Sequence, residues 1–182
     1  MTANWTNRPI LITGATGFLG QHLTRRLVDL GAPVTVALCA EDGPAQTAAL
    51  PATVYRRDGD VRNYGQMRRL VEAAAPEILF HLAAVGVNDP FISEEMALRV
   101  NLHGTLNALR AVQRTGIQIQ RVIVAGTSYE YGPSGELDPG NVYAASKVAA
   151  WAFCRMYYRA TGCRWSWPGP LTSTGLGRTT AP

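Results

Sequence analysis

Short apolar runs and segments of helical periodicity follow one another along the chain. The apolar runs predict five strands, at residues 10–12, 34–38, 53–57, 77–84 and 121–125. Apolar residues recur at helical spacing over residues 19–30, 64–75, 94–115 and 142–160, and residues 40–51 are expected to form a loop or short helix. Strands that alternate with helices predict an α/β fold, a doubly wound parallel sheet with helices on both faces and right-handed crossovers.

Local signals mark several helix ends. The apolar positions of the first predicted helix are Leu19, Leu23, Leu27 and Leu30. Asn63 and Gln66 predict a capping box ahead of residues 64–75, which Pro76 ends. Asn101 is an unfavourable residue in the middle of the long helix at 94–115, which predicts that its side chain bonds backbone across the core.

Three glycines, Gly14, Gly17 and Gly20, follow the first predicted strand directly. Gly14 and Gly17 would let the backbone turn sharply and approach a pyrophosphate, and Gly20 would let the helix pack closely on the strand. The helix N-terminus offers free N–H groups and a positive dipole end to phosphates. The spacing alone also fits an ordinary strand–turn–helix, but its position after a strand favours a dinucleotide site in a Rossmann-type fold.

The end of the second strand lacks the acidic residue that holds the adenosine ribose in dinucleotide-binding folds. Leu38 and Cys39 occupy that place, and Glu41 and Asp42 lie slightly beyond it as substitutes. No arginine stands there to bind a 2′-phosphate, so we expect NAD in preference to NADP, which is not excluded. Asp60, after the third strand, is either a turn residue or a contact to adenine.

Tyr143 and Lys147 stand four residues apart near the start of the last helix and therefore share one face. An ammonium beside a phenol favours the phenolate, which can take a proton from a sugar hydroxyl while hydride leaves for a nicotinamide. Thr127, at the end of a strand, can hold the same oxygen. Tyrosine and lysine at this spacing usually decorate a surface, but the combination with the glycine turn favours catalysis. His81, by contrast, is more readily a packed histidine than a ligand.

Six segments together resemble the extended short-chain dehydrogenase/reductase family, the NAD-dependent sugar epimerases and dehydratases. They occur in family order and are TGATGFLG (13–20), GDV (59–61), HLAA (81–84), NLHGT (101–105), GTSYEYG (126–132) and YAASK (143–147). The resemblance implies Tyr143 as catalytic base, Lys147 as its activator and ribose ligand, and Thr127 as the hydroxyl that orients substrate. The implied cofactor-binding residues are Gly14, Thr16, Gly17, Phe18, Leu19, Gly20, Asp60, Val61, Leu82, Ala83, Ala84, Asn101, Tyr143 and Lys147.

The resemblance also implies a nucleotide-diphosphate sugar as substrate. Dehydratases of the family carry an acidic residue where this chain has Tyr129, with Glu130 one position away. Epimerase or ketosugar reductase chemistry is therefore favoured over a 4,6-dehydratase, and a non-catalytic dinucleotide-binding module is the alternative. Family members often form homodimers through the helix that bears the tyrosine and lysine, where Ala149, Ala150, Trp151 and Phe153 would suit the interface.

The last residues depart from the family pattern. We expect a dinucleotide-binding domain over residues 1–163 and an irregular tail over residues 164–182, so that the later strands and the substrate lobe are missing and a sheet edge is left uncovered. The hypothesis is a shifted reading frame. With permitted codons, residues 164–177 in the shifted frame give V-V-V-A-R-P-F-N-V-Y-G-P-G, the strand and loop found in the family.

Composition excludes several other classes of protein. The 182 residues carry a formal net charge of +4 with scattered arginine pairs, which argues against a nucleic-acid partner. The three cysteines have no metal-binding spacing and indicate a reducing compartment. No apolar run is long enough to span a membrane, and the first strand leaves no room for a signal peptide, so we expect a cytoplasmic protein.

Overall fold

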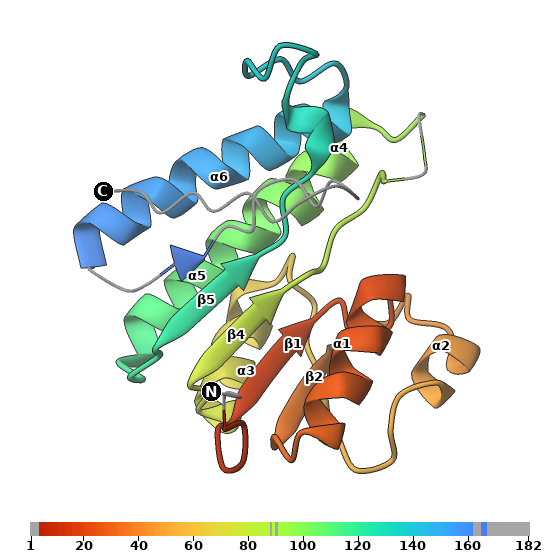
Figure 1. The fold of residues 1–182 in the computed structure, drawn as a ribbon, viewed down its shortest axis with the longest axis vertical. Coiled ribbons are helices and arrows are strands. Elements are labelled where there is room, and N and C mark those ends of the chain that lie inside the picture. The colour runs from red at the N-terminus through yellow and green to blue at the C-terminus, as the bar shows by residue number, and fades with distance from the viewer. Residues whose placement is uncertain (1–3, 88, 90, 162–164, 167–182) are drawn as a thin grey trace.

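The structure, a computed structural model, describes residues 4–87, 89, 91–161 and 165–166. Within them the chain forms a parallel sheet with the strand order β3-β2-β1-β4-β5-β6 (Figure 1). The strands are β1 (Ile10–Thr13), β2 (Val34–Leu38), β3 (Tyr55–Asp58), β4 (Ile78–His81), β5 (Arg121–Val124) and β6 (Trp165–Ser166). This order places β1 beside both β2 and β4, so their carboxyl ends meet at one edge of the sheet.

Helices connect these strands as the periodicity predicts. They are α1 (Phe18–Asp29), α2 (Pro44–Ala48), α3 (Tyr64–Ala74), α4 (Glu94–Ala97), α5 (Gly104–Thr115) and α6 (Val142–Thr161), with a π-helical segment η1 (Leu98–His103) and a 3₁₀ turn η2 (Ser128–Glu130). The α/β prediction of a doubly wound parallel sheet is confirmed.

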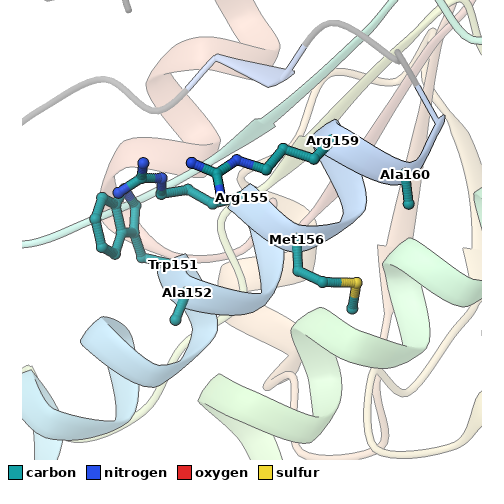
Figure 2. A pocket seen from close by; sticks show the side chains of 6 residues that line it. All are labelled: Trp151, Ala152, Arg155, Met156, Arg159 and Ala160. Carbon is teal, nitrogen blue, oxygen red and sulfur yellow. The ribbon is translucent and has the colours of Figure 1, made fainter.

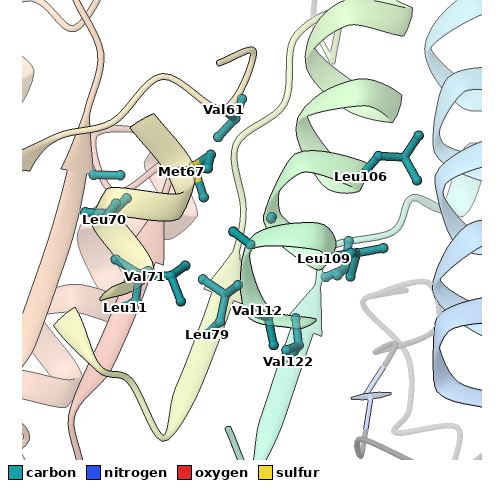
Figure 3. Packing of buried hydrophobic residues seen from close by; sticks show 14 of the residues in the cluster. Leu11, Val61, Met67, Leu70, Val71, Leu79, Leu106, Leu109, Val112 and Val122 are labelled. Carbon is teal, nitrogen blue, oxygen red and sulfur yellow. The ribbon is translucent and has the colours of Figure 1, made fainter. Parts of the chain in front are cut away.

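Two apolar clusters form the core, one on each face of the sheet. Alternate residues of a strand point to opposite faces, so Ile10 and Ile12 of β1 join the cluster that contains Leu27 of α1. Leu11 joins the other cluster, which contains residues of α3, α5 and α6, and part of which is shown in Figure 3. The central strands β1, β2 and β4 are therefore covered on both sides, as a parallel sheet requires, whereas β3 at the edge of the sheet is exposed.

The structure corrects two predicted details, the buried face of α1 and the capping box before α3. Leu19 is 47% exposed, because the face of α1 that packs on the sheet is formed by Gly20, Thr24 and Leu27 instead. The capping box before α3 is only half formed: Asn63 Oδ1 accepts from Gln66 N at 3.0 Å, but Gln66 Oε1 accepts from Asp60 N at 2.8 Å. Gln66 thus fixes the turn after β3 rather than the helix N-terminus.

The prediction of an irregular segment from residue 164 onward is wrong at Trp165 and Ser166. Their backbone forms β6, which pairs in parallel with Val122 and Ile123 of β5. An extended segment can fill the open edge of a sheet through backbone hydrogen bonds alone, which needs no apolar periodicity. The expected domain boundary at 163/164, Cys163 and the remainder of the tail lie outside the described residues.

Candidate active site

The turn between β1 and α1 requires glycine at two of its three glycine positions. Gly14 has φ +74°, and a Cβ there would lie 2.5 Å from Ala83 N. A Cβ on Gly20 would lie 2.1 Å from Gly14 O. At Gly17, however, the nearest atom to a Cβ would be 3.5 Å away, which is an ordinary contact. The fold therefore leaves an open space in front of Gly17 that a side chain would fill.

This open space lies at the N-terminus of α1. Gly17 is the N-cap residue and has no side-chain cap, so the first-turn N–H groups of the helix are available to an anion. The side chain of Phe18 is 85% exposed, and it and Leu19 border the turn on the solvent side. The glycine turn thus has the free donors, the dipole and the space that a pyrophosphate needs.

Asp42 ties the glycine turn to the end of β2. Its Oδ1 accepts a hydrogen bond from Thr16 Oγ1 at 2.5 Å, and its Oδ2 accepts from Cys39 N at 2.7 Å. The hydrogen bond from Thr16 to Asp42 therefore fixes the glycine turn against the loop after β2. Leu38 carries no polar side chain, so an acidic group for the ribose has to come from this loop.

The segment after β2 carries no arginine, but an arginine from another segment reaches it. Arg62 follows β3, and its Nε lies 2.9 Å from both carboxylate oxygens of Asp60, while its guanidinium also pairs with Glu41. These contacts hold the pKa of both carboxylates below their usual values. Parallel pairing of β2 with β3 brings the two loops together, which the sequence analysis did not use. Asp60 is thus both a turn residue, bonded to Arg62 N, and part of an ion pair.

A chain of buried hydrogen bonds begins at Thr13, next to the glycine turn. Thr13 Oγ1 lies 2.8 Å from His81 Nδ1, and His81 Nε2 lies 3.1 Å from Thr105 Oγ1. Since the Thr105 hydroxyl donates to Asn101 O at 2.6 Å, it accepts from His81, which carries its proton on Nε2. Burial lowers the pKa of His81 to about 3, so the ring is neutral. His81 is the packed histidine that was expected.

Asn101 bonds backbone across the core, as predicted. Its Oδ1 accepts from Val85 N at 2.9 Å, and its Nδ2 donates to Val85 O at 3.0 Å and to Ser146 Oγ at 2.9 Å. Ser146 Oγ in turn donates to Tyr143 O at 2.7 Å. Both amide protons of Asn101 are used in this way, so the residue connects the segment after β4 to α6. It lies in the π-helical segment η1, which joins α4 to α5 without a gap, so the predicted helix over residues 94–115 is continuous but locally widened at Asn101.

The remaining predicted cofactor residues line the same edge of the sheet. Leu82 N donates to Thr13 O at 3.0 Å, and the backbone of Leu82 and Ala83 is what a Cβ on Gly14 would strike. Ala84 continues this segment. Val61 packs against Gly104, and its carbonyl accepts from Asn107 Nδ2 at 2.9 Å. Small residues and the closely packed backbone therefore form the bottom of the site between β1 and β4.

Thr127, Tyr143 and Lys147 come from two elements at the same edge. Thr127 follows β5 and caps η2, accepting from Tyr129 N at 3.3 Å. Tyr143 and Lys147 lie one turn apart on α6 and are 7% and 1% exposed. Burial lowers the pKa of Lys147 to about 8. Burial also raises the pKa of Tyr143, and the Thr127 side chain is the neighbour that lowers it.

The direction expected for the Tyr143 pKa is therefore wrong for the protein alone. Desolvation of the phenol outweighs the one favourable neighbour, Thr127, since a buried phenolate loses its hydration, and the nearby Glu130 and Tyr129 raise the pKa further. A simple count in the sequence also points to Lys147, because it is the only lysine among the 17 lysine and arginine residues of the chain. Lysine shifts its pKa on burial and arginine does not, so the two are not interchangeable at this position.

Elsewhere on α6, a hollow of about 550 Å³ is lined by Trp151, Ala152, Arg155, Met156, Arg159 and Ala160 (Figure 2). Arg155 lies over the Trp151 ring at 4.8 Å. Of the residues expected at a dimer face, Ala150 is fully buried and Phe153 is 40% exposed. This surface is formed by the later turns of α6, beyond the turn that carries Tyr143 and Lys147.

Comparison with known proteins decides the family. The model of the NAD dependent epimerase/dehydratase family matches residues 10–180. The chain belongs to this family. The UDP-N-acetyl-alpha-D-glucosaminuronate decarboxylase of Bacillus cytotoxicus is 30% identical over 152 residues, which are 79% of this chain and 44% of the decarboxylase. The dTDP-4-dehydro-6-deoxy-D-allose reductase of a Streptomyces species is 34% identical over 142 residues, 74% of this chain and 42% of the reductase.

A solved structure of the same family shows the same fold. The UDP-glucose 4-epimerase of Thermus thermophilus, crystallised with NAD, matches with a TM-score of 0.71 at 28% identity over 87% of this chain and 53% of the epimerase. The chain thus spans about half the length of the relatives it matches. These epimerase/dehydratase relatives include epimerases, 4,6-dehydratases and reductases that act on nucleotide sugars, so membership alone does not select one reaction.

None of the helices in the described residues is both long enough and apolar enough to cross a membrane. No group of three or more potential metal ligands gathers in the same part of the chain.

Proposed function

We propose that this chain carries the NAD-binding and proton-transfer part of a nucleotide-sugar epimerase or ketosugar reductase. The observation that supports this most strongly is the burial of Lys147 one turn from Tyr143, at the sheet edge where Thr127 and the glycine turn also lie. Burying an ammonium group costs several kcal/mol even after relaxation. A chain that only had to fold would gain nothing from a lysine at that position.

NAD is the cofactor whose shape and charge fit this edge. The pyrophosphate would lie on the turn at Gly14, Gly17 and Gly20, which has free N–H groups and an open space. The backbone at Leu82, Ala83 and Ala84 would floor the site, and Tyr143 and Lys147 would hold the nicotinamide ribose. When bound, NAD takes a hydride from a sugar carbon or returns it.

The adenosine end favours NAD over NADP. Arg62 is already paired with Glu41 and Asp60, and Asp42 adds a third carboxylate nearby. Arg99, which also acts on Asp60, is paired with Glu95. The local charge is therefore negative. A 2′-phosphate would meet like charges in a partly desolvated place, which costs affinity.

The protein's own groups would move the proton. Tyr143 would accept the proton of a sugar hydroxyl, and Thr127 would hold the same oxygen in position. Lys147 would supply the positive charge that favours the phenolate once the site is closed around its ligands. Positioning of this kind accounts for much of the rate enhancement in such reactions.

Dehydratase chemistry is less well supported. Tyr129 occupies the position of the expected acid and is 58% exposed, whereas the Glu130 side chain is buried at 2% exposure and faces inward. A second candidate function is an NAD-binding module without turnover, which the raised pKa of the buried Tyr143 phenol supports.

A homodimer through α6 is part of the proposal. Phe153, Met156 and Tyr158 are 40%, 48% and 47% exposed on this helix, an unusual number of large apolar side chains in solvent. Sedimentation velocity of the chain and of a Met156→Glu variant tests this. The dimer should be lost in the variant, and a monomeric unmodified chain contradicts the proposal.

The decisive test of the function is exchange of Tyr143 for phenylalanine. The chain is incubated with NAD and a panel of nucleotide-diphosphate sugars, and sugar products are followed by NMR together with NADH absorbance. Tyr143→Phe should abolish turnover and retain NADH binding, while Tyr158→Phe, an exposed tyrosine on the same helix, should leave both unchanged. Binding of NADH by a chain that turns over no sugar selects the binding-module function.

A further inference from the structure

Glu130 is a buried carboxyl group that the proposed chemistry does not use. It is the last residue of the 3₁₀ turn η2, whose N-cap is Thr127, and it is 2% exposed. Its Oε1 accepts a hydrogen bond from Thr127 N at 2.9 Å, while the Thr127 side chain caps the same turn. This reciprocal capping box fixes the backbone that carries the Thr127 hydroxyl.

The second feature of Glu130 is its place beside the helix that carries Lys147. The turn η2 packs on α6, Glu130 and Lys147 are both almost completely buried, and their charges attract each other at a distance longer than a direct ion pair. Attraction between opposite charges is strong in such a place, because little water screens it. An ammonium so deeply buried needs a compensating charge, and removal of one partner of a buried pair is costly.

The other titratable groups that face Lys147 cannot supply this charge. His81, from β4, has a pKa of about 3 and is neutral or, when protonated, repels the ammonium. Cys154, two turns further along α6, is a buried thiol whose pKa burial raises to about 12. Tyr143 lies near Glu130, and burial raises the pKa of its phenol, which disfavours the charged phenolate. Among these groups, Glu130 is therefore the one that can supply the negative charge.

We propose that Glu130 is a positioning residue of the Tyr143–Lys147 centre, where its carboxylate is the buried counter-charge of Lys147 and its hydrogen bond fixes Thr127. The catalytic meaning of this pair rests on the proposed function. The pairing itself does not, because it is a property of the protein without cofactor or substrate.

The position also explains why Glu130 does not replace the missing dehydratase acid. Its buried side chain accepts a hydrogen bond from Thr127 N, whereas the neighbouring Tyr129 is exposed on the solvent side of η2. A group that expels water from a sugar must reach the sugar. Glu130 therefore acts through Lys147 and Thr127.

The single lysine makes a direct test feasible. Growth on lysine labelled with ¹³C at the ε carbon gives a protein with one labelled side chain, so its NMR signal needs no assignment. Titration of this signal measures the ionisation of Lys147 in the full chain. The midpoint should lie near pH 8 in the unmodified protein.

Glu130→Gln removes the charge and keeps an oxygen that accepts from Thr127 N. We expect the Lys147 midpoint to fall by about 1 pH unit or more, as for loss of a nearby opposite charge. Glu136→Gln is the matched control, because Glu136 is an exposed carboxylate on the adjacent loop that accepts a hydrogen bond from the Ser134 hydroxyl. This control should leave the midpoint in place.

An unchanged Lys147 midpoint in Glu130→Gln overturns the proposal. If that variant does not fold, the unmodified protein still decides. Besides the main step near pH 8, the lysine signal should show a second, smaller step in the acid range, where Glu130 takes up its proton. The absence of this acid-range step contradicts the role of Glu130 as counter-charge. Neither result depends on NADH binding or turnover, so failure of this inference and failure of the proposed function are distinguishable.

Discussion

Alanine substitutions at Gly17 and Gly20 separate a glycine required by a ligand from a glycine required by the fold. At Gly17 the backbone has φ −71° and ψ 167°, which alanine adopts freely, and the nearest atom to the new Cβ would be 3.5 Å away. Alanine makes the unfolded chain less flexible, which stabilises the folded protein, but it is a poorer N-cap than glycine, which destabilises it. The two effects oppose each other, so the free energy of unfolding should change by less than about 1 kcal/mol.

Ligand binding should respond in the opposite way. The Gly17 Cβ would occupy the space where the pyrophosphate approaches the backbone, and we expect NADH affinity to fall at least tenfold, equivalent to about 1.4 kcal/mol. At Gly20 the new Cβ would lie 2.1 Å from Gly14 O and 2.7 Å from Ala15 Cα. Because both are backbone atoms, the turn must move, and Gly20→Ala should lose about 1–3 kcal/mol of stability as well as NADH binding.

Denaturant unfolding and NADH fluorescence titration measure the two effects on the same samples. Gly140→Ala is the control, since no atom lies within 4 Å of a Cβ at that position and the backbone is unstrained. Normal NADH affinity in Gly17→Ala refutes the placement of the pyrophosphate on this turn. A loss of stability in Gly17→Ala as large as in Gly20→Ala refutes the structural reasoning.

Three other predictions concern the core and the tail. Asn101→Leu leaves the Val85 N–H and C=O and the Ser146 hydroxyl without their three hydrogen bonds, so unfolding by urea should show a loss of about 2–4 kcal/mol; a loss below about 1 kcal/mol contradicts the linking role. His81 has a folded pKa of about 3 against 6.5 in the unfolded chain, so its contribution to stability is complete above pH 6.5 and is lost as pH falls, by about 1.4 kcal/mol per pH unit. The slope between pH 6.5 and about 4 should be shallower in a folded His81→Asn variant, and equal slopes count against a neutral buried ring. Finally, the nucleotide sequence of codons 164–177 should permit the shifted frame described above, and one incompatible codon rules it out.

The order of elements was predictable because each strand and helix is long enough to show its own periodicity. The role of Asn101 was predictable for a related reason: a residue that disfavours helix in the middle of a helical pattern needs a tertiary explanation. The glycine turn followed from three residues and their position after β1. These inferences use contacts within a segment, or a conflict between a residue and its segment.

The features that were missed depend on contacts between segments. Arg62 reaches Glu41 only because β2 and β3 are neighbours, and its long side chain crosses from one loop to the other. The strand at Trp165 and Ser166 is formed by backbone pairing with β5, which leaves no side-chain pattern. Burial of Tyr143 raises its pKa, and no spacing in the sequence reports burial.

Calorimetric titration of the full chain with NAD and, separately, with NADP tests most directly whether these residues form a cofactor site. We expect heat of binding with NAD, and weaker binding or none with NADP because of the carboxylates around Arg62. A sample that circular dichroism shows to be folded, and that binds neither nucleotide, contradicts the cofactor site and the proposed function that depends on it.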